Sequence, residues 1–312
     1  MGTFITTLQP MLVMFLCMSA GFILNKTGVS PRNTDTVLSK VLTNVLMPAL
    51  IIDTFTKYCT VASLKEYGIM VLFSLLGLAL SVLIAFPLAR LFQKDGYEKK
   101  LYQYAFLSAN FGFLGNAIVP QILGEAALYP YMLFTLPLNL ACYGWWVNIL
   151  IPDGEQKKNG LKNLINPIFV CLVLGVVLGV TGADGWMPGF LRTTVGNLAG
   201  CMGPFAMILT GFVIGNYPIG QVIQNKKVWL ATLFRLILIP AVILGVMYLW
   251  GASKEVLIMA LFGFGTPLGL NTVVFPVAYH IKSCTGASMA MISHTACIVT
   301  IPIMYALLLA FL

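Results

Sequence analysis

Charged residues are scarce in this chain: they make up 9% of its 312 residues, against about 25% in a soluble globular protein. Hydrophobic residues make up 59%, more than a water-soluble fold of this size can hide. The sequence therefore excludes a soluble protein and indicates that the bilayer is its solvent. About ten helices of some 20 residues each would use most of the chain, which leaves no room for a soluble domain.

The residue patterns of common catalytic and metal sites are missing as well. The chain has two histidines and seven cysteines, and no two cysteines have CxxC spacing. An odd number of cysteines, most of them in apolar runs, predicts neither a disulfide framework nor a zinc site. No HExxH or GxSxG motif and no pair of acids within an apolar run is present. We therefore expect no enzyme activity, no metal site and no cofactor.

The apolar residues fall into ten segments with short polar connections. Their approximate ranges are 4–24, 37–56, 68–92, 102–123, 128–150, 165–181, 195–217, 228–250, 255–279 and 287–311. The first is long enough to span and lacks the basic start and cleavage site of a signal peptide, so we expect it to remain as a helix. The sequence predicts an all-α polytopic membrane protein with ten transmembrane helices: a first unit at 1–151, a cytoplasmic connector at 152–164 and a second unit at 165–312.

Lysine and arginine are distributed unevenly over the connections. Thirteen follow the odd-numbered segments, while the opposite side holds four: Lys57, Lys65, Arg192 and Lys254. This asymmetry predicts that both termini are extracytoplasmic. The net charge of +8 does not predict nucleic-acid binding, because the basic residues lie in short loops that set the membrane topology.

The prolines recur in the same order in the two halves. The pairs are Pro10 and Pro167, Pro48 and Pro204, Pro87 and Pro240, Pro120 and Pro276, and Pro137 and Pro302. Each half holds five segments, an odd number, so the second copy would enter the membrane upside down. The pattern predicts a five-plus-five inverted repeat, an architecture that alternating-access carriers use.

Two apolar segments are interrupted by glycine and proline at matching places. Residues 110–120 read Asn-Phe-Gly-Phe-Leu-Gly-Asn-Ala-Ile-Val-Pro, and residues 265–276 read Gly-Thr-Pro-Leu-Gly-Leu-Asn-Thr-Val-Val-Phe-Pro. Gly and Pro cost about 1 and 3 kcal/mol relative to Ala inside a helix, and unpaired backbone in a bilayer must be buried in protein or line a wet cavity. We therefore expect helices 4 and 9 to be broken and to meet at the substrate. The residues predicted to form this break and crossing are Gly112, Pro120, Gly265, Pro267, Gly269 and Pro276.

A half-helix that starts inside the membrane presents free N–H groups and the positive end of its dipole, which bind a carboxylate. We expect the two starts near Asn116/Ala117 and Asn271/Thr272. The candidate substrate-binding residues are Asn110, Gly115, Asn116, Ala117, Asn139, Asn271 and Thr272. The alternative, that these are kinked packing helices bridged by their asparagines, stays open.

Three ionisable residues are candidates for coupling or for attracting charge. Asp53 either takes part in proton coupling or lies at the outer interface. Arg235 either snorkels toward the cytoplasmic interface or attracts anions into an inner vestibule. His294, in the tenth segment, either bridges helices or relays protons.

In their order, these motifs resemble the auxin efflux carrier family. The resemblance rests on Met47-Pro-Ala-Leu50, on the run from Asn110 to Pro120, on Asn166-Pro167 and on Asn271 with Pro276. It covers essentially the whole chain, which is similar to a compact bacterial member, and is distantly similar to the bile-acid/sodium symporter fold. The resemblance implies ten helices, of which the fourth and ninth cross at their prolines.

The resemblance also implies a secondary active or facilitated transporter of a small organic anion, such as a dicarboxylate or an auxin-like acid, in the plasma membrane. Proton coupling and a homodimer are left open. A sodium-coupled symporter of the same fold is the alternative, although neither broken segment holds the acids that a cation cage needs. A channel is the third hypothesis, but the sequence shows no ring of charged residues or filter motif.

Overall fold

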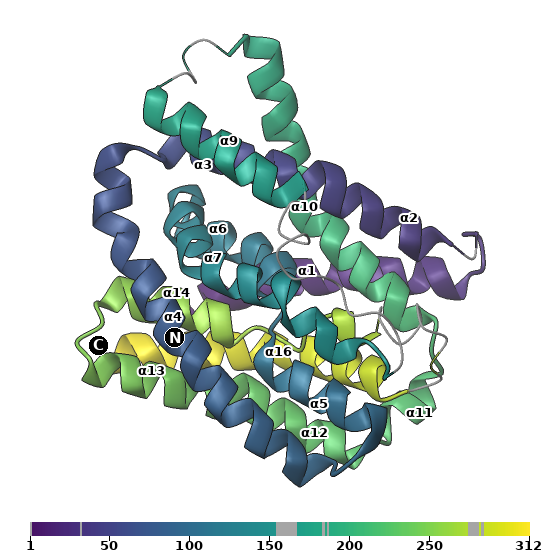
Figure 1. The fold of residues 1–312 in the computed structure, drawn as a ribbon. Helices are drawn as coiled ribbons and strands as arrows, with labels where there is room; N and C mark the ends of the chain where they lie inside the picture. The colour runs from purple at the N-terminus through teal and green to yellow at the C-terminus, as the bar shows by residue number, and fades with distance from the viewer. Residues whose placement is uncertain are drawn as a thin grey trace.

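The computed structural model describes residues 2–31, 33–153, 167–182, 185, 187–273, 281 and 284–312, and these residues form a helical protein (Figure 1). The first half contains α1 (Gly2–Lys26), α2 (Thr34–Val41), η1 (Leu42–Leu46), α3 (Met47–Tyr58), α4 (Val61–Phe92), α5 (Gly96–Leu107), η2 (Phe111–Gly115), α6 (Asn116–Leu123), η3 (Glu125–Ala127), α7 (Leu128–Gly144) and η4 (Trp146–Leu150). The second half contains α9 (Pro167–Thr181), α10 (Gly189–Gly215), α11 (Ile219–Ile223), α12 (Lys226–Leu233), η6 (Phe234–Leu238), α13 (Ile239–Leu249), α14 (Lys254–Phe264) and α16 (Thr285–Phe311).

Long apolar helices confirm that this is a multi-pass membrane protein. Among the described residues, seven helical stretches are long and apolar enough to cross a bilayer. They are Phe4–Lys26, Thr34–Tyr58, Val61–Phe92, Glu125–Leu150, Gly189–Gly215, Lys226–Leu249 and Thr285–Phe311. Two shorter apolar helices, Phe111–Leu123 and Pro167–Thr181, accompany them. The total of ten spans and the inverted repeat remain predictions.

Three helices widen into π-helical turns shortly before a proline. η1 precedes Pro48, η2 precedes Pro120, and η6 precedes Pro240. Proline lacks an N–H and its ring crowds the carbonyl four residues earlier. In η1 and η6, which contain that carbonyl, a wider turn relieves the crowding while the helix continues. Pro87 and Pro204 lie inside the regular α-helices α4 and α10, so the paired prolines of the two halves do not all produce the same local geometry.

The helices pack in two groups. In the first, α1 runs along α10, and α3 packs against α9 and α10. In the second, α4 packs against α5 and α7, α12 against α16, and α13 against α14. Figure 1 shows α3, α9 and α10 above and α4, α5, α12 and α13 below, with α6 and α7 between them. The candidate site lies where the two groups meet.

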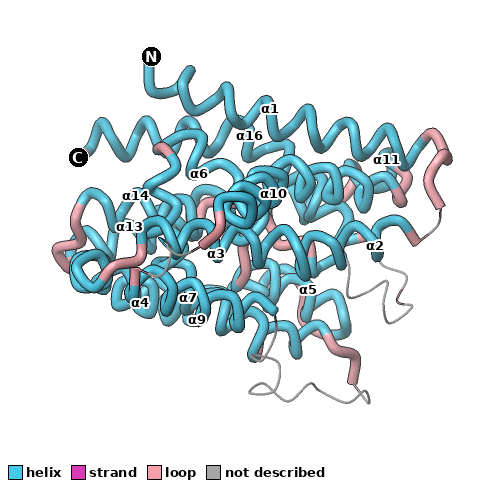
Figure 2. The backbone as a smooth tube through the Cα atoms, turned by 90° about the horizontal axis from the view of Figure 1, so that it is seen from above, coloured by secondary structure: helices cyan, strands magenta, loops and turns pink. Residues whose placement is uncertain are grey.

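Close packing within the first group depends on a glycine. A Cβ at Gly211 of α10 would overlap the backbone carbonyl of Met18 in α1, so only glycine permits this approach of the two helices. The contact between α1 and α16 joins the first group to the second. Figure 2 shows the N- and C-terminal ends, which belong to these two helices, at the same end of the molecule.

Candidate functional site

Two interrupted helices cross near the centre of the protein. α5 ends at Leu107, and the chain becomes helical again at Phe111. α14 ends at Phe264, and a new helical turn begins at Asn271. Between these ends, Ala109 pairs antiparallel with Leu268, and the Asn110 N–H donates to the Pro267 carbonyl at 2.7 Å. The two stretches of freed backbone therefore satisfy part of their hydrogen bonding with each other, as burial in a bilayer requires.

The first interruption comprises Ser108, Ala109 and Asn110. A π-helical turn, η2, begins at Phe111, and the regular helix α6 begins at Asn116 and contains Pro120. The chain leaves the helix before η2, where Ala109 pairs with Leu268 of the other interruption. The roles of Asn116, Ala117 and Pro120 in substrate binding and in the break stay predictions.

The second interruption contains three residues named in the sequence analysis. Gly265, Pro267 and Gly269 fall between α14 and the turn that begins at Asn271. Thr272 lies in that turn, and its hydroxyl donates to the Gly269 carbonyl at 2.9 Å. Pro276 lies outside the described residues.

A tyrosine that the sequence analysis missed connects both broken helices. The Tyr131 hydroxyl, from α7, donates to the Phe111 carbonyl at 2.9 Å and lies 3.4 Å from the Phe262 carbonyl of α14. Gly115 makes room for it, because a Cβ there would overlap the hydroxyl oxygen. Gly112 and Gly269 have ordinary space around them, so neither is needed for a close backbone approach. A buried tyrosine hydroxyl requires a partner, but the sequence does not show that this tyrosine is buried.

His294 links α16 to the crossing. Its Nδ1 lies 2.7 Å from the Ala290 carbonyl, and its Nε2 lies 2.8 Å from the Asn110 side-chain nitrogen. A carbonyl only accepts and an amide nitrogen only donates, so these contacts fit a neutral ring with its proton on Nδ1. The preceding residue, Ser293, accepts from the Leu268 N–H at 3.1 Å. This geometry is that of a helix-bridging histidine.

Asn271 is held by another network on the opposite side of the crossing. Its amide nitrogen donates to the Tyr104 hydroxyl at 2.6 Å. That hydroxyl lies 3.1 Å from the Cys142 sulfur, which in turn lies 3.6 Å from the Ser108 hydroxyl. Asn271 therefore connects the start of its half-helix to α5 and α7.

Asn116 differs from the other two asparagines because its amide is almost unused. The residue is buried, and its Oδ1 has no hydrogen-bond partner in the described part of the chain. Its Nδ2 has one weak acceptor, the Met47 sulfur at 3.8 Å. Leaving such a group unpaired in the interior costs about 1–3 kcal/mol, so Asn116 is available to a ligand.

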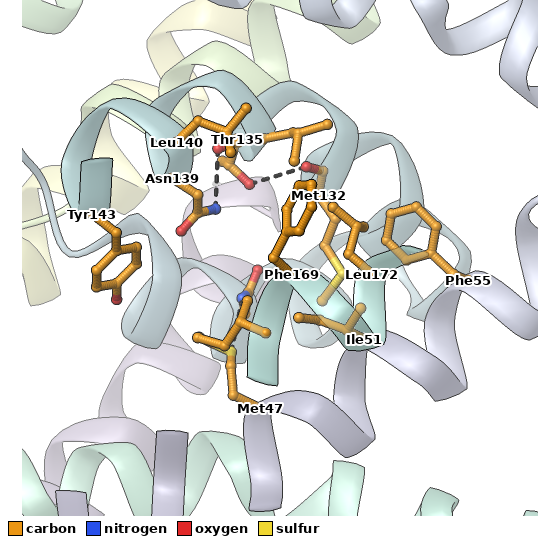
Figure 3. A pocket seen from close by; sticks show the side chains of 13 residues that line it. Met47, Ile51, Phe55, Met132, Thr135, Asn139, Leu140, Tyr143, Phe169 and Leu172 are labelled. Atoms are coloured by element: carbon orange, nitrogen blue, oxygen red, sulfur yellow. Dashed lines mark hydrogen bonds between the residues drawn. The ribbon is translucent and has the colours of Figure 1, made fainter. Parts of the chain in front are cut away.

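Asn116 lies between two cavities. The wide cavity has a volume of about 290 Å³ and is lined by Asp53, Lys57, Asn116, Ala117, Pro120, Glu125 and Gly203, among others. The apolar cavity, of about 60 Å³, is lined by Met47, Ile51, Phe55, Asn116, Met132, Thr135, Asn139, Tyr143, Phe169 and Leu172, among others. In Figure 3, Met132, Ile51, Phe55 and Leu172 lie together on one side of Thr135 and Asn139. The Asn139 amide nitrogen donates to the Thr135 carbonyl at 3.0 Å.

A third, small cavity continues from the apolar cavity to the crossing. Its volume is about 30 Å³, and we call it the crossing cavity; Phe111, Gly112, Phe113, Asn139 and Asn271 are among its lining residues. Asn139 lines both of these cavities, and Asn116 lines both the apolar and the wide cavity. Each neighbouring pair of cavities therefore shares a residue with a neutral amide.

Comparison with known proteins assigns the chain to a family. The family model described as "Membrane transport protein" matches residues 6–160 and 155–305. The chain belongs to this membrane transport protein family. The match confirms the resemblance to auxin efflux carriers seen in the sequence. A protein named "Uncharacterized transporter" from Methanothermobacter thermautotrophicus is 23% identical over 249 residues, which cover 80% of this chain and 79% of that protein.

Within this membrane transport protein, the remaining candidates lie away from the crossing. Asp53 is paired with Lys57 at 2.7 Å, with their side chains 16% and 40% exposed, at the edge of the wide cavity. Arg235 lies in η6 and is fully buried, so it does not reach the membrane surface as a snorkelling arginine would. No group of three or more His, Cys, Asp or Glu residues suited to a metal ion occurs within the described ranges.

Proposed function

We propose that this transporter is a secondary carrier for a small organic anion that works by alternating access. The observation that carries the proposal is the amide of Asn116, which is buried, almost unpaired within the described structure and shared by two cavities beside the crossing. An amide offers both donors and an acceptor, so it can bind a carboxylate or a carboxylic acid without the cost of a charge in the bilayer.

The charge of the site favours an anion. The first N–H groups of a helix have no partner within it and carry the positive end of its dipole. In this chain the first residues of η2, Phe111, Gly112 and Phe113, line the crossing cavity. The residues between α5 and α6 and between α14 and Val273 include no Asp or Glu. A cation site would need such oxygen ligands, so sodium binding at this crossing is less well supported.

The shape of the site favours an anion with an apolar part. The apolar cavity offers Met47, Ile51, Phe55, Phe169 and Leu172 against few polar groups. The wide cavity, in contrast, carries Lys57, Asp53 and Glu125. We infer that the carboxylate group lies near Asn116 and the start of η2 while the apolar part fills the apolar cavity. The wide cavity would be the extracytoplasmic entrance, in a plasma membrane with both termini outside.

Counterflow in proteoliposomes tests the proposal directly. A panel of labelled mono- and dicarboxylates would be measured with and without a pH gradient, and with sodium replaced by choline. We expect saturable counterflow of at least one carboxylate that does not need sodium. Loss of transport in choline would instead support the sodium symporter, and currents far above carrier turnover would support a channel.

Two variants of Asn116 test the site. Asn116→Leu removes both the donor and the acceptor, and Asn116→Asp places a negative charge where the anion would bind. We expect each variant to reduce counterflow about 100-fold or more. Asn116→Leu loses one to two hydrogen bonds to a charged group, and the carboxylate in Asn116→Asp repels the anion. Asn44→Leu is the matched control, since Asn44 is exposed on η1 and its amide donates to the Lys40 carbonyl of its own helix. Full counterflow in both Asn116 variants would show that the anion binds elsewhere.

A further inference from the structure

Within the described part of the chain, Arg235 is a buried cation with nothing to neutralise it. Its side chain is 0% exposed. Its Nε, Nη1 and Nη2 have no hydrogen-bond partner among the described residues, and the ion pairs seen in those ranges involve other residues, Asp53 with Lys57 and Lys100 with Asp153. Removal of a guanidinium from water without an opposite charge is among the most unfavourable arrangements in a protein. Such a group therefore points to a missing partner.

The local structure around Arg235 also departs from the regular pattern. The residue lies in the π-helical turn η6, and such turns are frequent at functional sites. Two buried hydroxyls without partners in the described structure, Thr232 of α12 and Ser288 of α16, lie on helices that pack against each other. η6 packs against α16 as well. Neighbouring helical elements around Arg235 therefore carry hydroxyl donors that have no hydrogen-bond partner among the described residues.

Aromatic side chains join η6 to α4 and α5. Phe234, which precedes Arg235, packs edge-on against Phe92 of α4 at 5.9 Å between ring centroids. Phe92 also contacts the rings of Tyr102 and Phe106 of α5, each at 5.2 Å. Since Arg235 is 0% exposed, a ligand can reach it only when helices that pack around η6 separate.

We propose that Arg235 is a second anion-binding group, distinct from the crossing, which binds a carboxylate in a state of the carrier where the surrounding helices have separated. The planar fork of a guanidinium matches the two oxygens of a carboxylate. Thr232 and Ser288, on two helices that pack against η6, carry hydroxyl donors as well. The inference depends on the proposed function for the identity of the anion, because the carboxylate at Arg235 is that of the transported substrate.

This assignment gives the unpaired charge a role in the transport cycle. In the closed state Arg235 is buried without a partner from the described residues, which raises the free energy of that state. In the open state Arg235 binds the anion. The anion therefore stabilises the open state, by an amount set by the difference between its affinities for the open and the closed state. Binding at Arg235 thereby couples the ligand to the conformational change.

Thermal stability in detergent gives the first test. Arg235→Met replaces the charge by an apolar side chain of similar length, and Arg235→Lys keeps the charge without the fork. In buffer without carboxylates, we expect Arg235→Met to raise the unfolding temperature by about 2 °C or more, since an unpaired buried charge is removed. Arg90→Met, at an exposed position of α4, is the control and should change little. A lower unfolding temperature for Arg235→Met would show that Arg235 is structurally paired and would overturn the proposal.

Chemical labelling gives the second test. Wild-type protein in phosphatidylcholine vesicles would be treated with phenylglyoxal, which modifies arginine, and the modified fraction of Arg235 and Arg90 would be measured by mass spectrometry. We expect slow labelling of Arg235, and protection of Arg235 but not of Arg90 by succinate or phenylacetate. No labelling of Arg235 under any condition, or labelling without protection by either carboxylate, would overturn the proposal. Protection by inorganic phosphate or by anionic lipid alone would also overturn it, because the ligand would then not be the transported carboxylate.

Counterflow separates this inference from the proposed function. If wild-type protein transports a carboxylate, Arg235→Met should weaken its apparent affinity about 10- to 100-fold, and Arg235→Lys should recover part of it. Unchanged transport by Arg235→Met would overturn the role of Arg235 while the proposed function stands. If the wild type transports none of the carboxylates tested, both the proposed function and this inference are wrong.

Discussion

The contact between Gly115 and Tyr131 provides a quantitative test of the crossing. Gly115→Ala would put a methyl group on the Tyr131 hydroxyl oxygen and 2.8 Å from its Cζ. Overpacking of this kind costs about 1–3 kcal/mol. Tyr131→Phe removes the donor to the Phe111 carbonyl, and a buried carbonyl left without its partner costs about 1–3 kcal/mol.

The double variant is more informative than either single change. Once the hydroxyl is absent, the methyl group that Gly115→Ala introduces loses its main clash, although the ring carbon at 2.8 Å still has to shift. We expect the double variant to be less destabilised than the sum of the single variants, by about 0.5–3 kcal/mol, the range observed for residues in contact. The free energy of unfolding would be measured by titration with sodium dodecyl sulfate in mixed micelles.

Another glycine of the crossing serves as the control. A Cβ at Gly269 would meet Ser108 and Tyr104 atoms at 3.6 Å, an ordinary contact. Gly269→Ala should therefore change the free energy of unfolding by no more than about 0.5 kcal/mol, as an uncrowded substitution does. If the changes in the free energy of unfolding caused by the Gly115 and Tyr131 variants add within about 0.3 kcal/mol, the two residues do not share a contact. That result would contradict the close approach of α7 to η2 at the crossing.

Two further predictions concern ionisable residues. Asp53→Asn frees the Lys57 ammonium at the edge of the wide cavity, so we expect this variant to have a lower KM for the anion and Lys57→Gln to have a higher one. Both effects should be lost in high salt, because salt screens such charges. An equal KM for the wild type and the two variants at low salt would contradict this prediction. His294→Gln keeps a side chain that can bond to Asn110, so we expect transport with an unchanged pH profile, whereas a flattened profile would identify His294 as a proton relay.

The sequence predicted an all-helical membrane protein, but it could not give the residues at which a helix is interrupted. Glycine, proline and the matching second segment led us to expect two broken helices. The position of the first interruption depends on the pairing of Ala109 with Leu268, residues far apart in the chain. Local helix preferences contain no information about that pairing, and they favour a break at Pro120, which lies inside α6.

The burial of particular side chains was also beyond the sequence. For Arg235 and Asp53 the sequence left open whether the charge lies within the membrane or near its surface. The structure buries Arg235 completely and places Asp53 in an ion pair whose two side chains are partly exposed. Tyr131 was missed since nothing in its local sequence distinguishes it from other aromatic residues of the fifth segment.

The distribution of hydrogen bonds separates residues that hold the crossing from residues that bind. Asn110 and Asn271 each bond to a neighbouring helix, which makes them suited to fixing the two interrupted backbones. In the described structure Arg235 lacks such a bond, and Asn116 has only the weak contact with the Met47 sulfur. A buried hydroxyl without a partner there, such as that of Thr266, is weaker evidence of a binding site, because a hydroxyl can rotate toward a carbonyl of its own helix.

If this division is correct, two asparagine variants should differ in kind. Asn110→Ala should lower the free energy of unfolding by about 1–3 kcal/mol and have the smaller effect of the two variants on transport per folded molecule. Asn116→Ala should have the larger effect on transport per folded molecule and the smaller effect on the free energy of unfolding. Unfolding in mixed micelles and counterflow normalised to folded protein would measure the two quantities. Equal ratios of lost stability to lost transport in the two variants would show that unpaired polar groups do not identify the binding residues in this protein.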